Sequence, residues 1–365
     1  MRILYGVVGE GMGHATRSRV MIQHLVDGGH EVEIMVSGRA HDVLARHFEG
    51  VHLIHGLRLV YEENTVKKTR TALENLVALG EGLPHNVAAY FELLDRFAPQ
   101  IVISDFESWA WGYGKSHRLP VISIDNMQII NRCSHDEALI GPHDTAFRLT
   151  RAVVKTKLPR CWHYLVTTFF FPPLRKERTT LVPPILRDEV IAIDRAAVER
   201  GDHVLVYQSS DSHESLIDVL GGFPDTDFLV YGLRRGIESN VVEGNIIHRP
   251  FSETDFIHDL ASARAVVAGG GFSLMSEAVY LGVPMLSVPL AGQFEQTLNG
   301  LYLERLGYGL HRADLGADDL AELLARADEL RANLTGHVQD GNRMVFDHLD
   351  RLIADIEDGS DRPLI

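Results

Sequence analysis

The sequence is poor in cysteine, in positive charge and in long apolar runs, and each shortage excludes a class of protein. Its two cysteines, Cys133 and Cys161, are too few for a disulfide framework and lack metal-ligand spacing, which indicates a reducing compartment. A formal charge of −15 leaves no basic footprint for general nucleic-acid binding. The longest uncharged run, Ala278 to Phe294, contains two prolines and therefore predicts core rather than a membrane span.

Targeting and metal-binding signals are also missing. Arg2 leads directly into an apolar run, so we expect no signal peptide and a cytoplasmic location. The 19 histidines are scattered without HxxxH or Cys/His spacing, so we expect no metal site and no cofactor. With 365 residues, 45% hydrophobic and 23% charged, the chain exceeds one ordinary core and predicts two α/β domains.

The most informative stretch runs from Ala265 to Gly309. A short apolar run, Ala265 to Ala268, ends in three glycines, Gly269 to Gly271. Phe272 to Leu281 then has helical spacing, with Gly282 placed to end the helix. In such a strand, turn and helix, glycines let backbone amides approach a ligand, and the start of the helix favours a phosphate.

Polar side chains follow this turn at helical spacing. We expect Ser273 at the N-cap and Glu277 one turn deeper, where its carboxylate would accept hydrogen bonds from a sugar diol. Glu277 would equally complement the helix dipole, and the helix alone leaves both roles open. Farther along, Glu295, Gln296 and Asn299 share one face of a second helix. Polar groups beyond the carboxyl ends of neighbouring strands are where an open α/β sheet binds its ligand.

The pattern G-G-G-F-S-x-x-x-E-x-x-x-x-G-V-P-M, followed by E-Q-x-x-N, resembles the nucleotide-sugar signature of GT-B glycosyltransferases, including the MurG-like, plant and antibiotic enzymes. The resemblance implies that Glu277 holds ribose hydroxyls and that Glu295 and Gln296 contact the donor sugar. Plant members carry a phosphate-binding His at the position of Gly269, so here the diphosphate would rely on backbone amides and hydroxyls. The donor-site residues expected on this basis are Ser209, Ser210, Phe251, Ser252, Gly269, Gly270, Gly271, Phe272, Ser273, Glu277, Glu295, Gln296 and Asn299.

The N-terminus repeats the strand, glycine turn and helix. Ile3 to Val8 reads as a strand, Gly9 to His14 as the turn and Ala15 to Asp27 as the helix. A Rossmann dinucleotide site is the rival interpretation. However, the third glycine falls one residue too early for G-x-G-x-x-G, and no acidic residue ends the second strand. The turn resembles the G-x-x-G-G-H loop of MurG-like enzymes.

Within this turn, His14 matches the catalytic His of plant glycosyltransferases. The resemblance implies that His14 takes a proton from an acceptor hydroxyl and that Asp105, which ends a buried strand, orients it. Packing for His14 and helix capping for Asp105 stay open as alternatives. The residues expected to border the acceptor are Gly11, Gly13, Glu107 and Asn126.

The segment from Arg148 to Arg178 differs from the rest of the chain. It holds eight Lys or Arg and a single acid, Glu177, together with the aromatic residues Trp162, Tyr164, Phe169, Phe170 and Phe171. Such a mixture indicates a surface that meets anionic lipid or a lipid-linked acceptor, which would make the protein membrane-associated. A core strand with a solvated basic face gives the same pattern, and the sequence leaves both interpretations open.

The resemblance therefore predicts an α/β protein of the GT-B class, with two Rossmann-like doubly wound domains facing across a cleft. We expect an acceptor-binding domain over 1–172, a linker region over 173–200 and a nucleotide-sugar-binding domain over 201–345. A C-terminal helix over 346–365 would pack back towards the first domain.

The predicted activity is that of an inverting, metal-independent glycosyltransferase of hexosyltransferase type. It would move a sugar from a nucleoside diphosphate sugar, of UDP or TDP type, to a hydroxyl of a small-molecule or lipid-linked acceptor. Two alternatives are a nucleotide-sugar 2-epimerase of the same fold, which would consume donor without acceptor, and a non-catalytic donor-binding subunit of a membrane glycosyltransferase. His14 and Asp105 in one continuous chain argue against the subunit.

Overall fold

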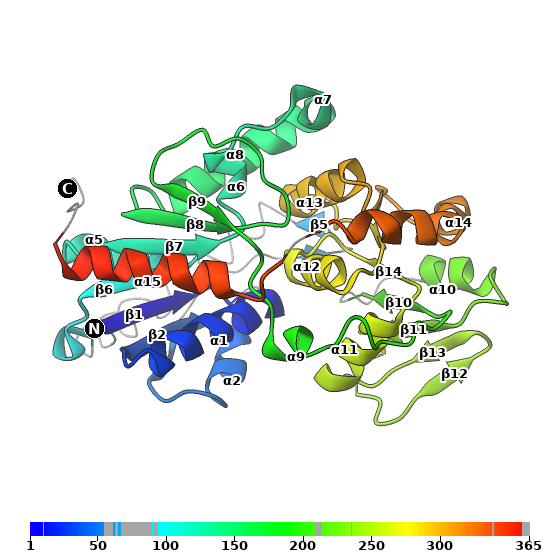
Figure 1. Cartoon of the computed structure of the whole chain (residues 1–365), viewed down its shortest axis with the longest axis horizontal. Coiled ribbons are helices and arrows are strands. Elements are labelled where there is room, and N and C mark those ends of the chain that lie inside the picture. The colour runs from blue at the N-terminus through cyan, green and yellow to red at the C-terminus, as the bar shows by residue number, and fades with distance from the viewer. Residues whose placement is uncertain are drawn as a thin grey trace. The chain divides into compact units, whose positions relative to one another are not determined.

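The computed structural model describes residues 1–9, 11–54, 61–62, 65–66, 90, 94–208, 214–234, 236–337 and 339–359. The chain divides into two compact units, each built on a seven-stranded sheet (Figure 1). Unit 1 comprises Met1–Tyr61, Val66–Arg187 and Asp340–Ile365, and unit 2 comprises Glu62–Thr65 and Asp188–Gln339. The chain thus passes from unit 1 to unit 2 after Arg187 and returns after Gln339.

The sheet of unit 1 is entirely parallel. Its four central strands are short, almost entirely buried runs, as expected where helices cover both sides of a parallel sheet, whereas the edge strand Val51–Ile54 exposes Leu53. The strand order reverses between β1 and β6, which makes this the switch point where such sheets bind ligands. Across the sheet the strands are β3 (Val51–Ile54), β2 (Glu31–Ser37), β1 (Arg2–Val7), β6 (Ile101–Asp105), β7 (Val121–Asp125), β8 (His163–Thr167) and β9 (Thr179–Val182).

The helices of unit 1 come from both ends of the chain. Val345, Leu349 and Ile353 of the last helix, α15, belong to the same core cluster as Met21 and Leu25 of α1. The described helices are α1 (Met12–Asp27), α2 (Ala40–Leu44), α5 (Ser108–Ser116), α6 (Ile129–Arg132), α7 (Glu137–Ile140), the 3₁₀ helix Gly141–His143, α8 (Asp144–Lys157) and α15 (Arg343–Glu357). A separate two-stranded sheet pairs β4 (Tyr61–Glu62) with β5 (Thr65–Val66).

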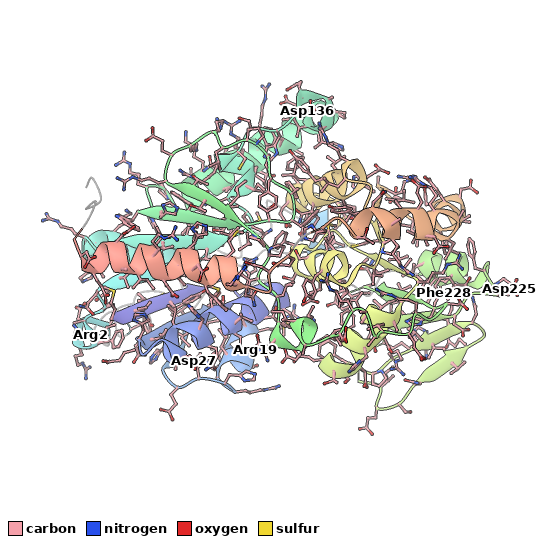
Figure 2. All side chains as sticks on the ribbon, viewed as in Figure 1. Arg2, Arg19, Asp27, Asp136, Asp225 and Phe228 are labelled. Atoms are coloured by element: carbon pink, nitrogen blue, oxygen red, sulfur yellow. The ribbon has the colours of Figure 1, made fainter. Side chains whose placement is uncertain are left out.

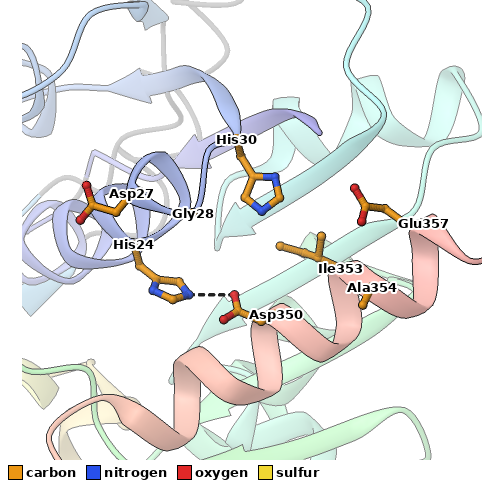
Figure 3. A pocket seen from close by; sticks show the side chains of 8 residues that line it. All are labelled: His24, Asp27, Gly28, His30, Asp350, Ile353, Ala354 and Glu357. Atoms are coloured by element: carbon orange, nitrogen blue, oxygen red, sulfur yellow. Dashed lines mark hydrogen bonds and ion pairs between the residues drawn. The ribbon is translucent and has the colours of Figure 1, made fainter.

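A polar contact joins α15 to the end of α1 as well (Figure 3). His24 Nε2 lies 2.8 Å from Asp350 Oδ1, and the His24 ring stacks on Phe346 with the ring centroids 4.0 Å apart. His24 and Asp350 border a depression of about 460 Å³. The C-terminal helix is therefore tied to the first helix of the chain through both its apolar and its polar face.

Unit 2 repeats the plan with one antiparallel edge. Strand β12 pairs antiparallel with β13, and the other pairings are parallel. Phe228, labelled in Figure 2, begins β11 and is fully buried in the core of this unit. Across the sheet the strands are β12 (Val241–Glu243), β13 (Ile246–His248), β11 (Phe228–Tyr231), β10 (Val204–Tyr207), β14 (Ala265–Ala268), β15 (Met285–Ser287) and β16 (Gly309–His311). Its described helices are α9 (Asp188–Ile191), α10 (Glu214–Gly221), α11 (Glu253–Ser262), α12 (Phe272–Leu281), α13 (Phe294–Arg305) and α14 (Ala317–Leu334).

The basic segment from Arg148 to Arg178 does not place its aromatic residues together on the surface. Trp162, Tyr164, Phe169 and Phe170 are buried in unit 1, and only Phe171, at 58% exposure, reaches solvent. Four of the five aromatic residues therefore belong to the core. Tyr164 lies in β8, Trp162 comes directly before this strand, and Phe169 and Phe170 come shortly after it. Among the residues that the structure describes, no helix is both long enough and apolar enough to cross a bilayer.

We expect Leu349→Ala to lower the free energy of unfolding by about 2–5 kcal/mol, because it leaves a cavity in the shared core of α1 and α15. Arg351→Ala, on the exposed side of the same helix, is the matched control and should change stability by about 0.5 kcal/mol or less. Urea denaturation measures both. Equal midpoints for the two variants would show that α15 contributes little to the stability of unit 1.

Candidate functional site

His14 and Asp105 lie together at the switch point of unit 1. Asp105 is the last residue of β6 and is fully buried, while His14 is the third residue of α1, which follows β1 in the chain. His14 Nδ1 is 2.8 Å from Asp105 Oδ1. Both polar contacts of the imidazole within the described residues use Nδ1, and 18% of the side chain is exposed. The structure thus brings the two residues together as the sequence predicts.

A third residue, Arg17, completes this cluster and was not anticipated from the sequence. Its Nε donates to Asp105 Oδ2 at 2.8 Å, its Nη2 donates to Asp105 Oδ1, and its Nη1 donates to Asn126 Oδ1 at 2.7 Å. Ser18 Oγ also donates to Asp105 Oδ2, at 3.0 Å. The available signal was spacing, because a residue three positions after His14 on a helix lies on the same face.

Burial and this charge pattern set the protonation states. Burial alone would raise the pKa of Asp105, but the adjacent Arg17 and His14 hold it well below its usual range. The pKa of His14 is lowered by burial and then by the charge of Arg17, against the opposing effect of Asp105. The imidazole is therefore neutral near pH 7 and able to accept a proton.

Neighbouring Asp125, at the end of β7, is also fully buried. Burial raises its pKa to about 6, and the charge of Asp105 acts in the same direction. Hydrogen bonds from Ser123 Oγ at 2.6 Å and from the amide of Gln128 at 2.9 Å oppose that rise. The cluster therefore holds one firmly ionised carboxylate and one that takes up a proton in mildly acidic solution.

The residues predicted to border the acceptor have different surroundings. Glu107 is buried and caps α5, accepting hydrogen bonds from the amides of Trp109 at 3.0 Å and Ala110 at 2.6 Å. The cap predicted as an alternative role for Asp105 thus belongs to Glu107. Gly11 precedes α1 with a φ of 91°, a backbone conformation that favours glycine. The remaining two residues are Gly13, in the first turn of α1, and Asn126, which accepts from Arg17.

In unit 2, the glycine turn connects β14 to α12 over the predicted residues. A Cβ at Gly270 would lie 2.3 Å from the carbonyl oxygen of Gln296, so only glycine allows α13 to approach this closely. At Gly271, by contrast, an added Cβ would meet no atom within 4 Å. Gly271 is also the N-cap of α12, which has no side-chain cap, so Ser273 is the second residue of the helix rather than its N-cap.

Side chains of α13 hold this turn in place. The side-chain Nδ2 of Asn299 donates to the carbonyl of Gly270 at 3.1 Å and to Glu295 Oε1 at 2.6 Å. Gln296 Oε1 accepts from the amide of Leu290 at 3.0 Å. Asn299 is buried, whereas Glu295 and Gln296 are half-buried. The three residues on one helix face therefore support the turn, with Asn299 tied most closely to it.

The other predicted donor residues are dispersed over unit 2. Glu277 lies in the second turn of α12 and is 6% exposed, while Phe272 at its start is buried. Phe251 is 70% exposed after β13, and Ser252 caps α11, its Oγ accepting from the amide of Asp255 at 3.2 Å. Ser209 and Ser210 lie outside the described residues.

A second depression, of about 620 Å³, occurs in unit 2 and contains none of the predicted site residues. It lies beside Leu281 and Gly282, where α12 ends, and its arginines bind backbone carbonyls: Arg195 that of Tyr280 at 2.9 Å and Arg200 that of Leu281 at 2.8 Å. Across the described residues, no three His, Cys, Asp or Glu side chains are grouped as a metal ion would require.

Comparison with known proteins gives one family. Residues 1–328 match the family model described as Glycosyl transferase family 1. A protein of Methanosarcina acetivorans named as an uncharacterized glycosyltransferase is 23% identical over 340 residues, which cover 85% of each chain. A UDP-N-acetylglucosamine--N-acetylmuramyl-(pentapeptide) pyrophosphoryl-undecaprenol N-acetylglucosamine transferase of Bacillus thuringiensis is 26% identical over 153 residues, 36% of this chain and 42% of that protein.

Solved structures give the same fold. The calicheamicin glycosyltransferase superposes with a TM-score of 0.62 at 18% identity, covering 97% of this chain and 98% of that one. Together with the two mostly parallel sheets, this likeness confirms the predicted GT-B class with two Rossmann-like domains.

Proposed function

The chain belongs to glycosyl transferase family 1, and we propose that it is an inverting, metal-independent enzyme acting on a nucleoside diphosphate sugar. Enzymatic transfer of a sugar from a donor to an acceptor follows from the family. The inverting course, the metal independence and the residue roles are the proposal. The observation that carries it is the 2.8 Å contact between His14 Nδ1 and buried Asp105, with part of the imidazole exposed.

In the proposed reaction, His14 Nε2 takes the proton from an acceptor hydroxyl. The acceptor oxygen forms a bond to the anomeric carbon while the bond from that carbon to the diphosphate oxygen breaks. The electron pair of the broken bond leaves with the nucleoside diphosphate, and attack from the opposite face inverts the anomeric centre. Asp105 keeps the hydrogen of His14 on Nδ1, which leaves the lone pair on Nε2.

The donor phosphates are assigned to the glycine turn of unit 2. The first amides of α12 have no side-chain cap, and the space at Gly271 is open. Amides at a helix start favour an anion, so they would stabilise the charge that develops on the leaving diphosphate. Ser209 and Ser210, which follow β10 in the chain, are proposed to assist. This arrangement would supply the charge stabilisation that other transferases obtain from Mg²⁺.

The remaining donor contacts follow from position in the sheet. Phe251 comes after β13 and the turn comes after β14, three strand intervals away, or about 14 Å. The exposed ring of Phe251 suits stacking on a base, and Glu277 would accept hydrogen bonds from the ribose. Glu295 and Gln296, half-buried on α13, would reach the sugar. A UDP donor is favoured because the similar Bacillus thuringiensis transferase is named for a UDP-linked sugar.

The two alternatives have less support. The similar proteins cited above are named as transferases, which does not favour a 2-epimerase or a non-catalytic subunit.

For the acceptor, we propose a lipid-linked molecule met at an anionic membrane surface. Helix α8 exposes Leu149 at 45% and Val153 at 56%, flanked by the exposed cations Arg148 and Lys155. Such a basic amphipathic face suits the headgroup region of an anionic bilayer.

We expect His14→Gln to reduce transfer by about 10²–10⁴-fold while leaving donor affinity unchanged, because only proton transfer is lost. In the unmodified protein the neutral imidazole is the active form, and its pKa is lowered from the ordinary value of 6.5. The acid limb of kcat/KM should therefore lie below pH 6.5. Steady-state kinetics against pH measure both quantities. Unchanged turnover in His14→Gln would remove His14 from the mechanism.

UDP at about 100 times its dissociation constant should stabilise the protein by about 2.7 kcal/mol, measured as a thermal shift. Gly271→Ala should abolish this shift, because its methyl group would fill the space in front of the α12 amides. Glu277→Gln should weaken it through loss of the ribose contact. Gly112→Ala, at an equally open position in unit 1, is the control. An unchanged UDP shift in Gly271→Ala would show that the phosphates bind elsewhere.

We expect the protein to sediment with vesicles that contain anionic phospholipid and to stay in the supernatant with vesicles of neutral phospholipid. Replacing the exposed pair by Leu149→Ser and Val153→Ser should weaken this binding without changing UDP affinity. Equal sedimentation of the variant and the unmodified protein would exclude α8 as the lipid contact.

A further inference from the structure

Arg17 is a buried arginine whose contacts all lie within the His14 and Asp105 cluster. Its guanidinium engages both oxygens of Asp105 and donates to Asn126 Oδ1. It is 5% exposed and lies on the inward face of α1, one turn beyond His14. A side-on pair with both carboxylate oxygens fixes the plane of the carboxylate as well as its charge. Asp105 thus has one allowed orientation.

The same guanidinium also lies next to the imidazole. Arg17 Nη2 is 2.6 Å from His14 Nδ1 and donates to Asp105 Oδ1, the oxygen that His14 contacts at 2.8 Å. Because an ionised carboxylate only accepts hydrogen bonds, His14 bonds to Asp105 only when Nδ1 carries the hydrogen. Asp105 is therefore the group that favours the tautomer with a free lone pair on Nε2, whereas Arg17 Nη2, itself a donor beside Nδ1, does not add to that preference.

A second proton on the ring would create two cations beside one carboxylate. Asp105 stabilises an imidazolium, but burial and the charge of Arg17 on the same carboxylate outweigh that effect. Burial and the Arg17 charge lower the pKa of His14 accordingly, and Lys157, at the end of α8, adds to the effect. Facing Arg17 from the other packed strands are Tyr5 of β1 and Asp125 of β7.

We propose that Arg17 is a positioning residue of the transfer site: it fixes the orientation of the Asp105 carboxylate that the imidazole contacts, and it keeps His14 neutral. This inference rests on the proposed role of His14 as the base. Arg17 itself touches neither donor nor acceptor in the proposal. The proton that Nε2 takes from the acceptor hydroxyl then passes to water, because the imidazolium beside Arg17 is disfavoured, and the base returns to its neutral form.

The test is an NMR titration of the whole protein without substrate, reading the ring nitrogens of His14, assigned by their loss in His14→Gln. In Arg17→Met we expect the pKa of His14 to rise by about one unit or more, because Asp105 then pairs with His14 alone. Arg17→Lys keeps the charge and should hold the pKa close to that of the unmodified protein. Arg19→Met removes a charge from the same helix at the residue labelled in Figure 2, and should leave the titration unchanged.

Kinetics supply the second readout, since a purely structural role would lower activity without moving the pH profile. The acid limb of kcat/KM should shift to higher pH in Arg17→Met and stay in place in Arg17→Lys. If Arg17→Met fails to fold, Arg17→Gln, which keeps an N–H donor but removes the charge, replaces it, and the same rise in the pKa of His14 is expected.

The outcomes separate this inference from the proposed function. A folded Arg17→Met with an unchanged pKa of His14 would overturn the role of Arg17, whatever the activity. A raised pKa in Arg17→Met, combined with full turnover in His14→Gln, would support the control of His14 by Arg17 while removing His14 as the base. Because the titration needs no substrate, it does not depend on identifying the donor or the acceptor.

Discussion

The site in unit 1 depends on one constraint: a fully buried carboxylate, Asp105, must be compensated where β6 ends. Leaving such a charge unpaired costs several kcal/mol, so the residues around it are constrained. Arg17 and Ser18 from α1 and His14 from the first turn of that helix all contact it. The position of α1 over the switch point follows from this compensation as much as from its apolar face. The contacts that arrange His14 and Arg17 around Asp105 therefore also help to hold α1 against the sheet.

The switch region of each unit uses a strand, a glycine turn and a helix, but presents different groups. In unit 1 the helix start carries the imidazole of His14, so the turn presents a side chain. In unit 2 the helix start carries Gly271 and no capping side chain, so the turn presents backbone amides. A side chain that exchanges a proton suits an acceptor, and amides suit an anion. In the proposed reaction, the same local architecture would therefore serve the acceptor in one unit and the donor in the other.

Close approach, rather than a tight turn alone, explains the glycines of unit 2. Gly270 has no room for a Cβ because the backbone of α13 passes beside it, and Asn299 binds its carbonyl. Asn299 therefore serves the turn directly, Glu295 accepts a hydrogen bond from the Asn299 side chain, and Gln296 accepts one from the backbone amide of Leu290. The aromatic residues between Arg148 and Arg178 form no joint surface for a related reason. Strand β8 lies inside the sheet, and the aromatic residues in it and beside it, except Phe171, pack in the core.

The amino-acid sequence by itself determined the two-unit α/β plan and the glycine turns, and its resemblance to glycosyltransferases pointed to His14 and Asp105. The plan and the turns are local features, because apolar runs, glycines and helical spacing act within a few residues. Only the tertiary structure decided that Glu107 caps α5, that Gly271 rather than Ser273 is the N-cap of α12, and that Arg17 turns inward to share Asp105. The inward position of Arg17 depends on which buried charge lies opposite which helix face. Packing between segments far apart in the chain decides that arrangement.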